Sequence, residues 1–153
     1  DQVFIATSDG KAIRIEVPDV RCMGRATTGV KGIELSRRDF VVSMDVVKPG
    51  ESYVLTITEN GYGKRTRIDE YRTQGRGGKG LINMKVNKKT GNVVGSRMVY
   101  GNEEEEVIIA TREAIVLKTS VDRISVQGRS TQGVLVMRPE PGDKVVAVAL
   151  SEE

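Results

Sequence analysis

Apolar and polar residues alternate along short segments of this chain, and turn signals separate the segments. The alternation is clearest where Ile13, Ile15 and Val17 share one face and charged side chains occupy the other. Pro18 follows, and proline cannot donate a hydrogen bond to a strand ladder. The pattern therefore predicts a β-strand with one buried face that ends at this proline.

Two dipeptides predict tight hairpin turns between such strands. Asp9-Gly10 and Asn60-Gly61 each stand between runs of Val, Ile and Thr. A two-residue type I′ turn needs positive φ at both central residues, and glycine takes positive φ without a steric cost. We expect a hairpin with a type I′ turn at each of these two sites.

The segment 102–118 gives a mixed signal. Its sequence NEEEEVIIATREAIVLK contains many helix formers, with acidic residues in what would be the first turn, and Ala114 stands where a hairpin would favour glycine. Against a helix, Val107, Ile108 and Ile109 are β-branched, and β-branched residues favour strands. Because the segment also aligns with the two clearer hairpins, we predict a hairpin here.

The chain consists of three copies of one unit. The first hairpin segments align without gaps, and Thr7, Thr58 and Thr111 fall in register: VFIATSDGKAIRI (3–15), VLTITENGYGKRT (54–66) and VIIATREAIVLKT (107–119). A second set of segments follows at matching distances: GRATTGVKGIEL (24–35), GRGGKGLINM (75–84) and GRSTQGVLVM (128–137). A third set closes the units: VVSMDVV (41–47), VVGSRMV (93–99) and VVAVAL (145–150).

Each unit has about 50 residues and is predicted to form four short strands. Such units are typical of propeller-like blades, which bury both faces only by stacking on their neighbours. We therefore predict an all-β, propeller-like fold of four-stranded blades. The chain would form a single repeat domain over residues 1–153, with approximate units 1–50, 51–101 and 102–153.

Composition narrows the class of protein. Hydrophobic residues make up 38% of the 153 residues and aromatic residues 4%, so Val, Ile, Leu and Met must form most of the core. The apolar runs are far shorter than the roughly 20 residues that cross a bilayer. The single cysteine, Cys22, has no second cysteine in the chain with which to form a disulfide, which fits a reducing compartment. We expect a soluble, intracellular protein.

The distribution of charge is more informative than the net charge of +3. Residues 51–100 carry ten Lys and Arg against four Asp and Glu, whereas residues 101–153 carry six against ten. A basic middle third favours a polyanionic partner. Inside it lies the glycine-rich, basic segment TQGRGGKG (73–80), which offers no apolar side chain to a core.

Three motifs in this order resemble the later blades of the C-terminal domain of the DNA gyrase A subunit: ENGYGKRT, EYRTQGRGGKG and GRSTQGV. The resemblance covers essentially the whole chain. It implies a β-pinwheel, a propeller-like fold whose blades exchange strands, with DNA wrapped around its outer edge. In that family the domain usually has six blades, so this sequence would be the second half.

The family's hallmark box has the form Gln-Arg/Lys-Arg-Gly-Gly-Arg/Lys-Gly. Gly75 replaces one cation of the box here, and the remaining positions match: Gln74, Arg76, Gly77, Gly78, Lys79 and Gly80. The copies in the other two units match less well, so we expect DNA affinity to peak in the middle unit. The resemblance of the box to the family's motif favours contacts between this segment and DNA phosphates.

Bare backbone beside positive charge suits a phosphate group. Our hypothesis is that Gly77, Gly78 and Gly80 offer backbone N–H groups while Arg76 and Lys79 supply charge. Further cations would extend the track in this unit and mark equivalent places in the others: Lys64, Arg65, Arg67, Arg72, Arg25, Lys31 and Arg129. The alternative is that the glycines only form a tight turn and the cations are solvated.

The resemblance also implies a biological setting. The partners would be double-stranded DNA, the gyrase B subunit, which belongs to the same enzyme, and the remainder of the gyrase A subunit. They would meet in the bacterial cytoplasm, at the nucleoid. Wrapping would support ATP-dependent negative supercoiling by the parent type II topoisomerase. No cofactor is expected in this chain, because ATP and Mg²⁺ would be used elsewhere in the parent enzyme.

Catalysis within this chain is not expected. The sequence has no histidine, which excludes Ser-His and Cys-His nucleophile arrangements and His-ligated metals.

Two alternatives to the gyrase interpretation stay open. One is the corresponding domain of topoisomerase IV, and the other is a propeller-type scaffold for protein interactions, which would need an exposed apolar or aromatic patch.

Overall fold

The structure, a computed structural model, describes residues 1–17 and 29–151. Cys22 and Arg25 lie outside these residues. Two short 3-10 helices, η2 (Ile68–Glu70) and η3 (Val121–Arg123), follow two of the strands. The strands are β1 (Gln2–Thr7), β2 (Lys11–Glu16), β3 (Val41–Val47), β4 (Tyr53–Thr58), β5 (Tyr62–Arg67), β6 (Thr73–Gln74), β7 (Leu81–Ile82), β8 (Val93–Val99), β9 (Glu106–Thr111), β10 (Val116–Ser120), β11 (Val134–Leu135) and β12 (Val145–Ser151).

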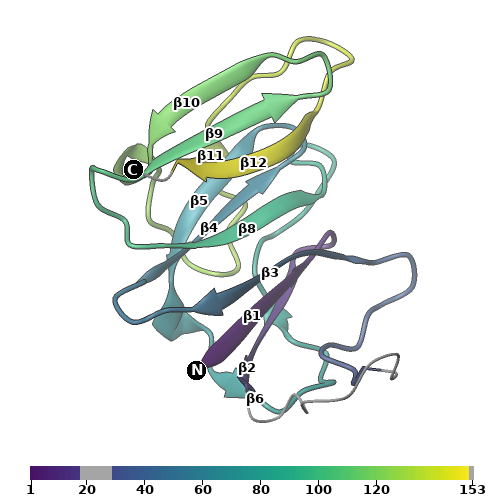
Figure 1. Cartoon of the computed structure of the whole chain (residues 1–153). Coiled ribbons are helices and arrows are strands. Elements are labelled where there is room, and N and C mark those ends of the chain that lie inside the picture. The colour runs from purple at the N-terminus through teal and green to yellow at the C-terminus, as the bar shows by residue number, and fades with distance from the viewer. Residues whose placement is uncertain (18–28, 152–153) are drawn as a thin grey trace.

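These strands form three sheets that follow one another along the molecule (Figure 1). The first sheet has the order β3-β1-β2-β6, and β7 also pairs with β2. The second has the order β8-β4-β5-β11, and the third β12-β9-β10. Each sheet therefore contains a hairpin and has the last strand of its own unit on one side of that hairpin. The all-β prediction is confirmed.

The fourth strand of a sheet comes from the next unit. β6 and β7 belong to the second unit by sequence, yet they pair with β2 of the first. In the same way β11 of the third unit pairs with β5 of the second. We call the contact of β6 and β7 with β2 the first junction and that of β11 with β5 the second junction. Among the described residues, no strand pairs with the outer edge of β10.

The hairpin turns share one geometry, which differs from the type I′ prediction. Gly10 and Gly61 have φ of 86° and 87°, but the described non-glycine residues with positive φ are Arg38 and Ala114, so Asp9 and Asn60 lack it. A type I′ turn is thus excluded. The pattern fits the longer hairpin loop in which a left-handed residue follows the turn.

A threonine closes each of these turns. The N–H of Gly10 donates to the Thr7 carbonyl at 3.2 Å, and the N–H of Lys11 donates to the Thr7 hydroxyl at 3.2 Å. The same two bonds recur at Thr58 and at Thr111. The threonines that align in sequence therefore have a common structural role.

The third hairpin confirms the strand prediction for residues 102–118. β9 and β10 pair antiparallel, with Ile109 opposite Leu117. Ala114 takes the left-handed position with φ of 66°. Its counterparts must be glycine, because a Cβ at Gly10 would lie 2.2 Å from the Met84 carbonyl oxygen of the next unit. Ala114 is exposed, so there is room for its Cβ.

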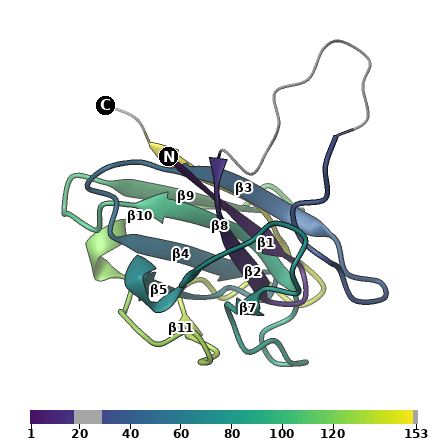
Figure 2. The same ribbon diagram turned by 90° about the horizontal axis from the view of Figure 1, so that it is seen from below.

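Apolar side chains fill the spaces between the sheets, which lie one over another when seen from below (Figure 2). Between the first and second sheets, Phe4 meets Tyr71 edge to face with ring centroids 5.0 Å apart. A larger cluster lies between the second and third sheets: Leu55, Ile57, Val99, Val107, Ile109, Val121, Ile124, Met137 and Val145. The blades thus bury their faces against each other, as a stacked repeat requires.

Arginines on the hairpins also join consecutive units. Arg14 donates from Nη1 to the carbonyls of Ile68 and Tyr71, at 3.2 and 3.1 Å. Arg65 stands at the equivalent position of the second unit and donates to carbonyls of the third unit in the same way. The corresponding residue of the third unit is Lys118, which pairs with Glu106 at 3.3 Å and is exposed.

Candidate nucleic-acid interface

The glycine-rich box loop, residues 75–80, lies across the first junction. The N–H of Gly77 donates to the Gly32 carbonyl at 2.7 Å, and the Gly78 carbonyl accepts from the N–H of Glu34 at 2.7 Å. Arg76 donates from Nη1 to the Lys31 carbonyl at 3.4 Å. The fold therefore brings together the predicted cations of two units, Lys31 and Arg76.

Five of the predicted cations are exposed: Lys31, Arg67, Arg72, Arg76 and Lys79. The three ion pairs found within residues 1–17 and 29–151 involve none of them. Arg67 lies over the Tyr53 ring, with its guanidinium carbon 5.9 Å from the ring centroid. These five side chains are therefore open to solvent and are not paired with a carboxylate among the described residues.

The glycines of the loop are explained partly by packing. Gly80 has φ of 77°, and a Cβ there would lie 2.5 Å from the Ala12 carbonyl oxygen on β2. Its small size allows the loop to approach that strand closely. The N–H of Gly77 is bonded to Gly32, so the prediction that it offers a donor to a phosphate is wrong. Gly78 is half-buried, and its carbonyl is also engaged.

Gln74 is part of β6 and half-buried, in parallel pairing with Ile15 of β2. Its side-chain oxygen Oε1 is buried without a hydrogen-bond partner among the described residues. The box therefore begins inside the sheet and turns outward only after Gln74. The exposed cations Arg76 and Lys79 follow on the outward part.

The structure corrects the prediction for Lys64 and Arg65, which are buried. Both were expected to contact phosphate, but their relative exposures are 0% and 8%. Arg65 donates to the Ile124 carbonyl at 2.7 Å and to the Asp122 carbonyl at 3.1 Å. Neither side chain is free to meet a ligand from solvent, because the third unit covers both.

Lys64 holds a loop of the third unit instead. Its Nζ donates to the carbonyls of Gly128, Arg129 and Thr131 at 2.6, 2.8 and 3.1 Å. Burial lowers the pKa of Lys64 to about 8. The nearby Glu70 carboxylate acts in the opposite direction, because it favours the charged form. This loop of the third unit is the counterpart of the box loop.

Arg129 is half-buried at the second junction. Its backbone N–H donates to Glu70 Oε1 at 3.2 Å, and its side-chain Nη1 donates to the Ile82 carbonyl at 3.0 Å. Its Nε is buried without a partner among the described residues. Part of this guanidinium is therefore committed to the protein, and the side chain is half-buried, whereas Arg76 and Lys79 of the box loop are exposed.

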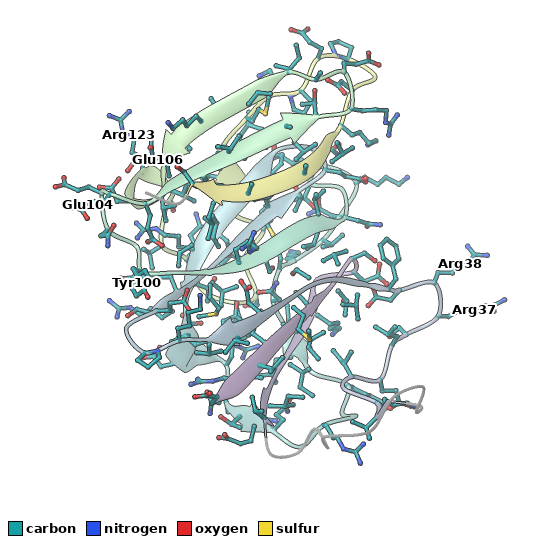
Figure 3. The ribbon with its side chains drawn as sticks, viewed as in Figure 1. Arg37, Arg38, Tyr100, Glu104, Glu106 and Arg123 are labelled. Carbon is teal, nitrogen blue, oxygen red and sulfur yellow. The ribbon has the colours of Figure 1, made fainter. Side chains whose placement is uncertain are left out.

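Several exposed cations were missed by the sequence analysis. Lys85, Lys88 and Lys89 follow β7, and Lys85 donates its backbone N–H to the Thr131 carbonyl at 3.0 Å. Arg37 and Arg38 project outward from the loop before β3 (Figure 3). The lysines form part of the basic middle third, so the charge count alone would have pointed to them.

The side of the molecule away from Arg37 and Arg38 carries several glutamates. Figure 3 shows Glu104 and Glu106, with Tyr100 and Arg123, on the side of the molecule away from Arg37 and Arg38. Residues 103–106 are four consecutive glutamates. A polyanion approaching the molecule would be repelled at this end and attracted at the other.

Within residues 1–17 and 29–151, no group of three or more His, Cys, Asp or Glu side chains converges in a way that could hold a metal ion. In the same residues, no helix has the length and hydrophobicity needed to traverse a bilayer.

The chain is similar in sequence to part of the DNA gyrase A subunit. The model of the family described as "DNA gyrase C-terminal domain, beta-propeller" matches residues 1–48, 52–99 and 105–152. The gyrase A subunit of Salmonella typhimurium is 41% identical over 148 residues, which are 97% of this chain and 16% of that protein. The gyrase A subunit of Dehalogenimonas lykanthroporepellens is 42% identical, and the match covers 100% of this chain and 19% of that protein. The chain thus spans less than a fifth of these relatives.

Solved structures share the fold. A DNA gyrase A C-terminal domain is 30% identical with a TM-score of 0.90, and the match covers 98% of this chain and 50% of that one. The C-terminal domain of a DNA topoisomerase IV has a TM-score of 0.91 at 20% identity, covering 99% and 47%. Together with the family match, this likeness confirms the prediction of a propeller-like fold with three repeats.

Proposed function

Because the chain belongs to the DNA gyrase C-terminal domain family of β-propellers, we propose that it binds and wraps double-stranded DNA without reading its sequence. The observation that carries the proposal is the group of exposed cations at the first junction. Arg76 and Lys79 lie in the box loop, Arg72 directly precedes β6, and the Lys31 carbonyl of the neighbouring unit accepts from Arg76. None of the four takes part in an ion pair among the described residues.

Cations of this kind suit the phosphate backbone. Arginine binds a phosphate with two parallel N–H donors, and lysine acts as a point charge. Contacts to phosphates fix the position of a protein on a duplex but carry no sequence information directly. The proposed binding is therefore strongly dependent on salt and nearly independent of sequence.

Wrapping follows from the repetition of the units. Successive junctions place Lys31 and Arg76 at one position and Arg129 at the next, so a duplex that contacts both follows the outer edge of the stacked sheets. Bending a few tens of base pairs costs about 1 to 6 kcal/mol, which the phosphate contacts offset. The acidic residues 103–106 would limit the path at the other end of the strands.

The proposed setting is the gyrase holoenzyme in the cytoplasm. This chain would act together with DNA, the gyrase B subunit, which completes the enzyme, and the rest of the gyrase A subunit. Its wrapping would support ATP-dependent negative supercoiling. The catalytic steps, and the ATP and Mg²⁺ that they use, would belong to the other parts of that enzyme. The topoisomerase IV alternative rests on a likeness at 20% identity, which supports only a common fold.

Wrapping is tested by the topology of closed DNA. Nicked circular DNA is ligated with the chain bound and then freed of protein. If the chain wraps DNA, the products have a shifted distribution of linking number, and the shift grows with the amount of protein. The variant R72A/R76A/K79A should shift it less. A distribution that stays unchanged at saturating protein would contradict wrapping, even if binding is observed.

A further inference from the structure

The most unusual side chain of the second junction is Lys64. It lies on β5, has 0% relative exposure, and directs its ammonium group at the loop 128–131 of the following unit. Four acceptors surround Nζ, because the Thr131 hydroxyl lies at 3.2 Å in addition to the three carbonyls. A buried ammonium must be paired or fully hydrogen-bonded, and here the acceptors come from a single loop.

The equivalent positions of the other units carry apolar residues. Ile13 occupies this position in the first unit and Leu117 in the third. Ile13 meets the box loop through an apolar contact, since its Cδ1 lies 3.6 Å from the place where a Cβ of Gly78 would be. The repeat can therefore be built without a lysine, and its presence in the second unit calls for a separate explanation.

The held loop carries Arg129, which is fixed from several sides. The Glu70 carboxylate on η2 accepts a hydrogen bond from the backbone N–H of Arg129, and the Ile82 carbonyl accepts one from its Nη1. The Thr131 hydroxyl donates to the Gly128 carbonyl at 2.8 Å, which closes the loop on itself. The charged groups that act on Lys64 from the elements around it are Glu70 and Arg129 itself.

We propose that Lys64 is a positioning residue: its ammonium group fixes the loop 128–131 in the shape that presents the Arg129 side chain to a DNA phosphate at the second junction. The inference rests on the proposed function. It gives Lys64 an indirect part in DNA binding, through the backbone carbonyls that it holds. Without the ammonium, the Arg129 carbonyl loses its donor, while the Gly128 carbonyl keeps the Thr131 hydroxyl and the Thr131 carbonyl keeps the Lys85 N–H. The loop must then rearrange or take up water.

The first test needs no DNA. We would compare amide hydrogen exchange at residues 128–133 in the wild type, in Lys64→Leu and in Lys79→Leu. Leucine is chosen because it stands at the equivalent position in the third unit, and Lys64→Met serves if the leucine variant does not fold. We expect loop exchange in Lys64→Leu to rise about tenfold or more, with β4 unchanged. The exposed-site control Lys79→Leu should leave loop exchange unchanged.

The second test is a double-mutant cycle on DNA binding. The probe is a random-sequence duplex of about 40 base pairs, titrated over a range of salt concentrations. Lys64→Leu and Arg129→Ala should each reduce the salt slope by up to roughly 0.9, the value of one phosphate contact. The double variant should lose no more than Arg129→Ala alone, because both changes remove the same contact. Lys79→Leu combined with Arg129→Ala should instead give additive losses.

The outcomes separate this inference from the proposed function. Unchanged loop exchange in Lys64→Leu would overturn the positioning role whether or not the chain binds DNA. Additive losses of salt slope in Lys64→Leu and Arg129→Ala would overturn the route through Arg129. A wild-type chain that does not bind the duplex would overturn the proposed function and the DNA part of this inference, while the exchange result would still decide whether Lys64 orders the loop.

Discussion

The two junctions have the same architecture but hold their loops by different chemistry. At the first junction, the box loop rests on the apolar Ile13, and its cations Arg76 and Lys79 stay exposed. At the second, the loop 128–131 is held by a buried ammonium, and Arg129 is partly engaged by the protein. Both loops also make backbone hydrogen bonds to the neighbouring unit, but the loop whose buried support is apolar keeps its cations exposed, whereas the loop held by the ammonium group has a half-buried arginine.

This difference suggests how a repeat protein divides its tasks. In our proposal the first junction binds a polyanion, and the second joins two units firmly. We therefore expect substitutions at the second junction to affect stability most, and substitutions at the first to affect DNA binding with little change in stability.

The largest effect is expected from Gly61→Ala at the second junction. Gly61 has φ of 87°, and an added Cβ would lie 1.7 Å from the Met137 carbonyl oxygen. We predict a loss of about 3 kcal/mol in the free energy of unfolding, from the left-handed backbone and the clash together. Gly142→Ala is the matched control, since φ there is 83° and nothing lies within 4 Å. It should cost about 1 kcal/mol. Equal losses in urea unfolding would contradict the close approach of the units.

A somewhat smaller loss is expected from Arg65→Ala. Its guanidinium donates to carbonyls of the third unit, and truncation leaves these buried acceptors without a donor. We predict a loss of about 2 kcal/mol in the free energy of unfolding. Lys118→Ala removes the equivalent residue of the third unit, an exposed lysine paired with Glu106, and should cost less than about 0.5 kcal/mol. If the two variants unfold at the same urea concentration, Arg65 does not join the units.

The pH dependence of stability probes Lys64 directly. Because burial lowers its pKa to about 8, the unfolded chain binds a proton between about pH 8 and 10.5 that the folded chain has released. The free energy of unfolding should therefore rise with pH through this window, by up to about 3 kcal/mol. Urea unfolding at several pH values would measure it. Lys64→Leu should lack this rise and Lys79→Leu should keep it, whereas a rise that persists in Lys64→Leu would assign it to another group.

The smallest effects are expected from single cations on DNA binding. Lys79→Ala should reduce the salt slope by about 0.9, and Arg129→Ala by less, because Arg129 is partly engaged with Ile82. Neither change should alter the midpoint of urea unfolding by a large amount. Fluorescence anisotropy across a salt series provides the slopes. A larger loss for Arg129 than for Lys79 would reverse our ranking of the junctions.

Much of the fold could be predicted from the sequence because its signals are local. Runs of Val, Ile and Thr with a glycine after each turn indicate hairpins, and the threefold repetition removed the doubt about residues 102–118. The turn type was missed because Asp-Gly and Asn-Gly fit type I′ turns equally well. The observed turns are accompanied by a hydrogen bond to the hydroxyl of each threonine. At the first two turns, a carbonyl oxygen of the next unit also lies beside the glycine.

The candidate site was harder to predict, because burial in this protein depends on the next unit. Lys64, Arg65 and Arg67 form a basic run in the sequence, yet only Arg67 is exposed. The strand that covers β5 lies about 70 residues further along the chain. No local sequence pattern predicts this long-range pairing or the burial of Lys64 and Arg65. The exposure of Arg76 and Lys79 was easier to foresee, since a segment of four glycines and two cations has nothing to bury.

The central claim is that the cations around the box loop bind DNA through its phosphates. The most direct test is the binding of a random duplex of about 40 base pairs across a salt series, with R72A/R76A/K79A compared with R112A/K118A/R123A. The second variant removes the same charge from exposed sites of the third unit. We predict that the slope becomes shallower by roughly 0.9 per lost contact in the first variant and changes little in the second. Equal slopes in both variants, or no binding by the wild type, would contradict the claim.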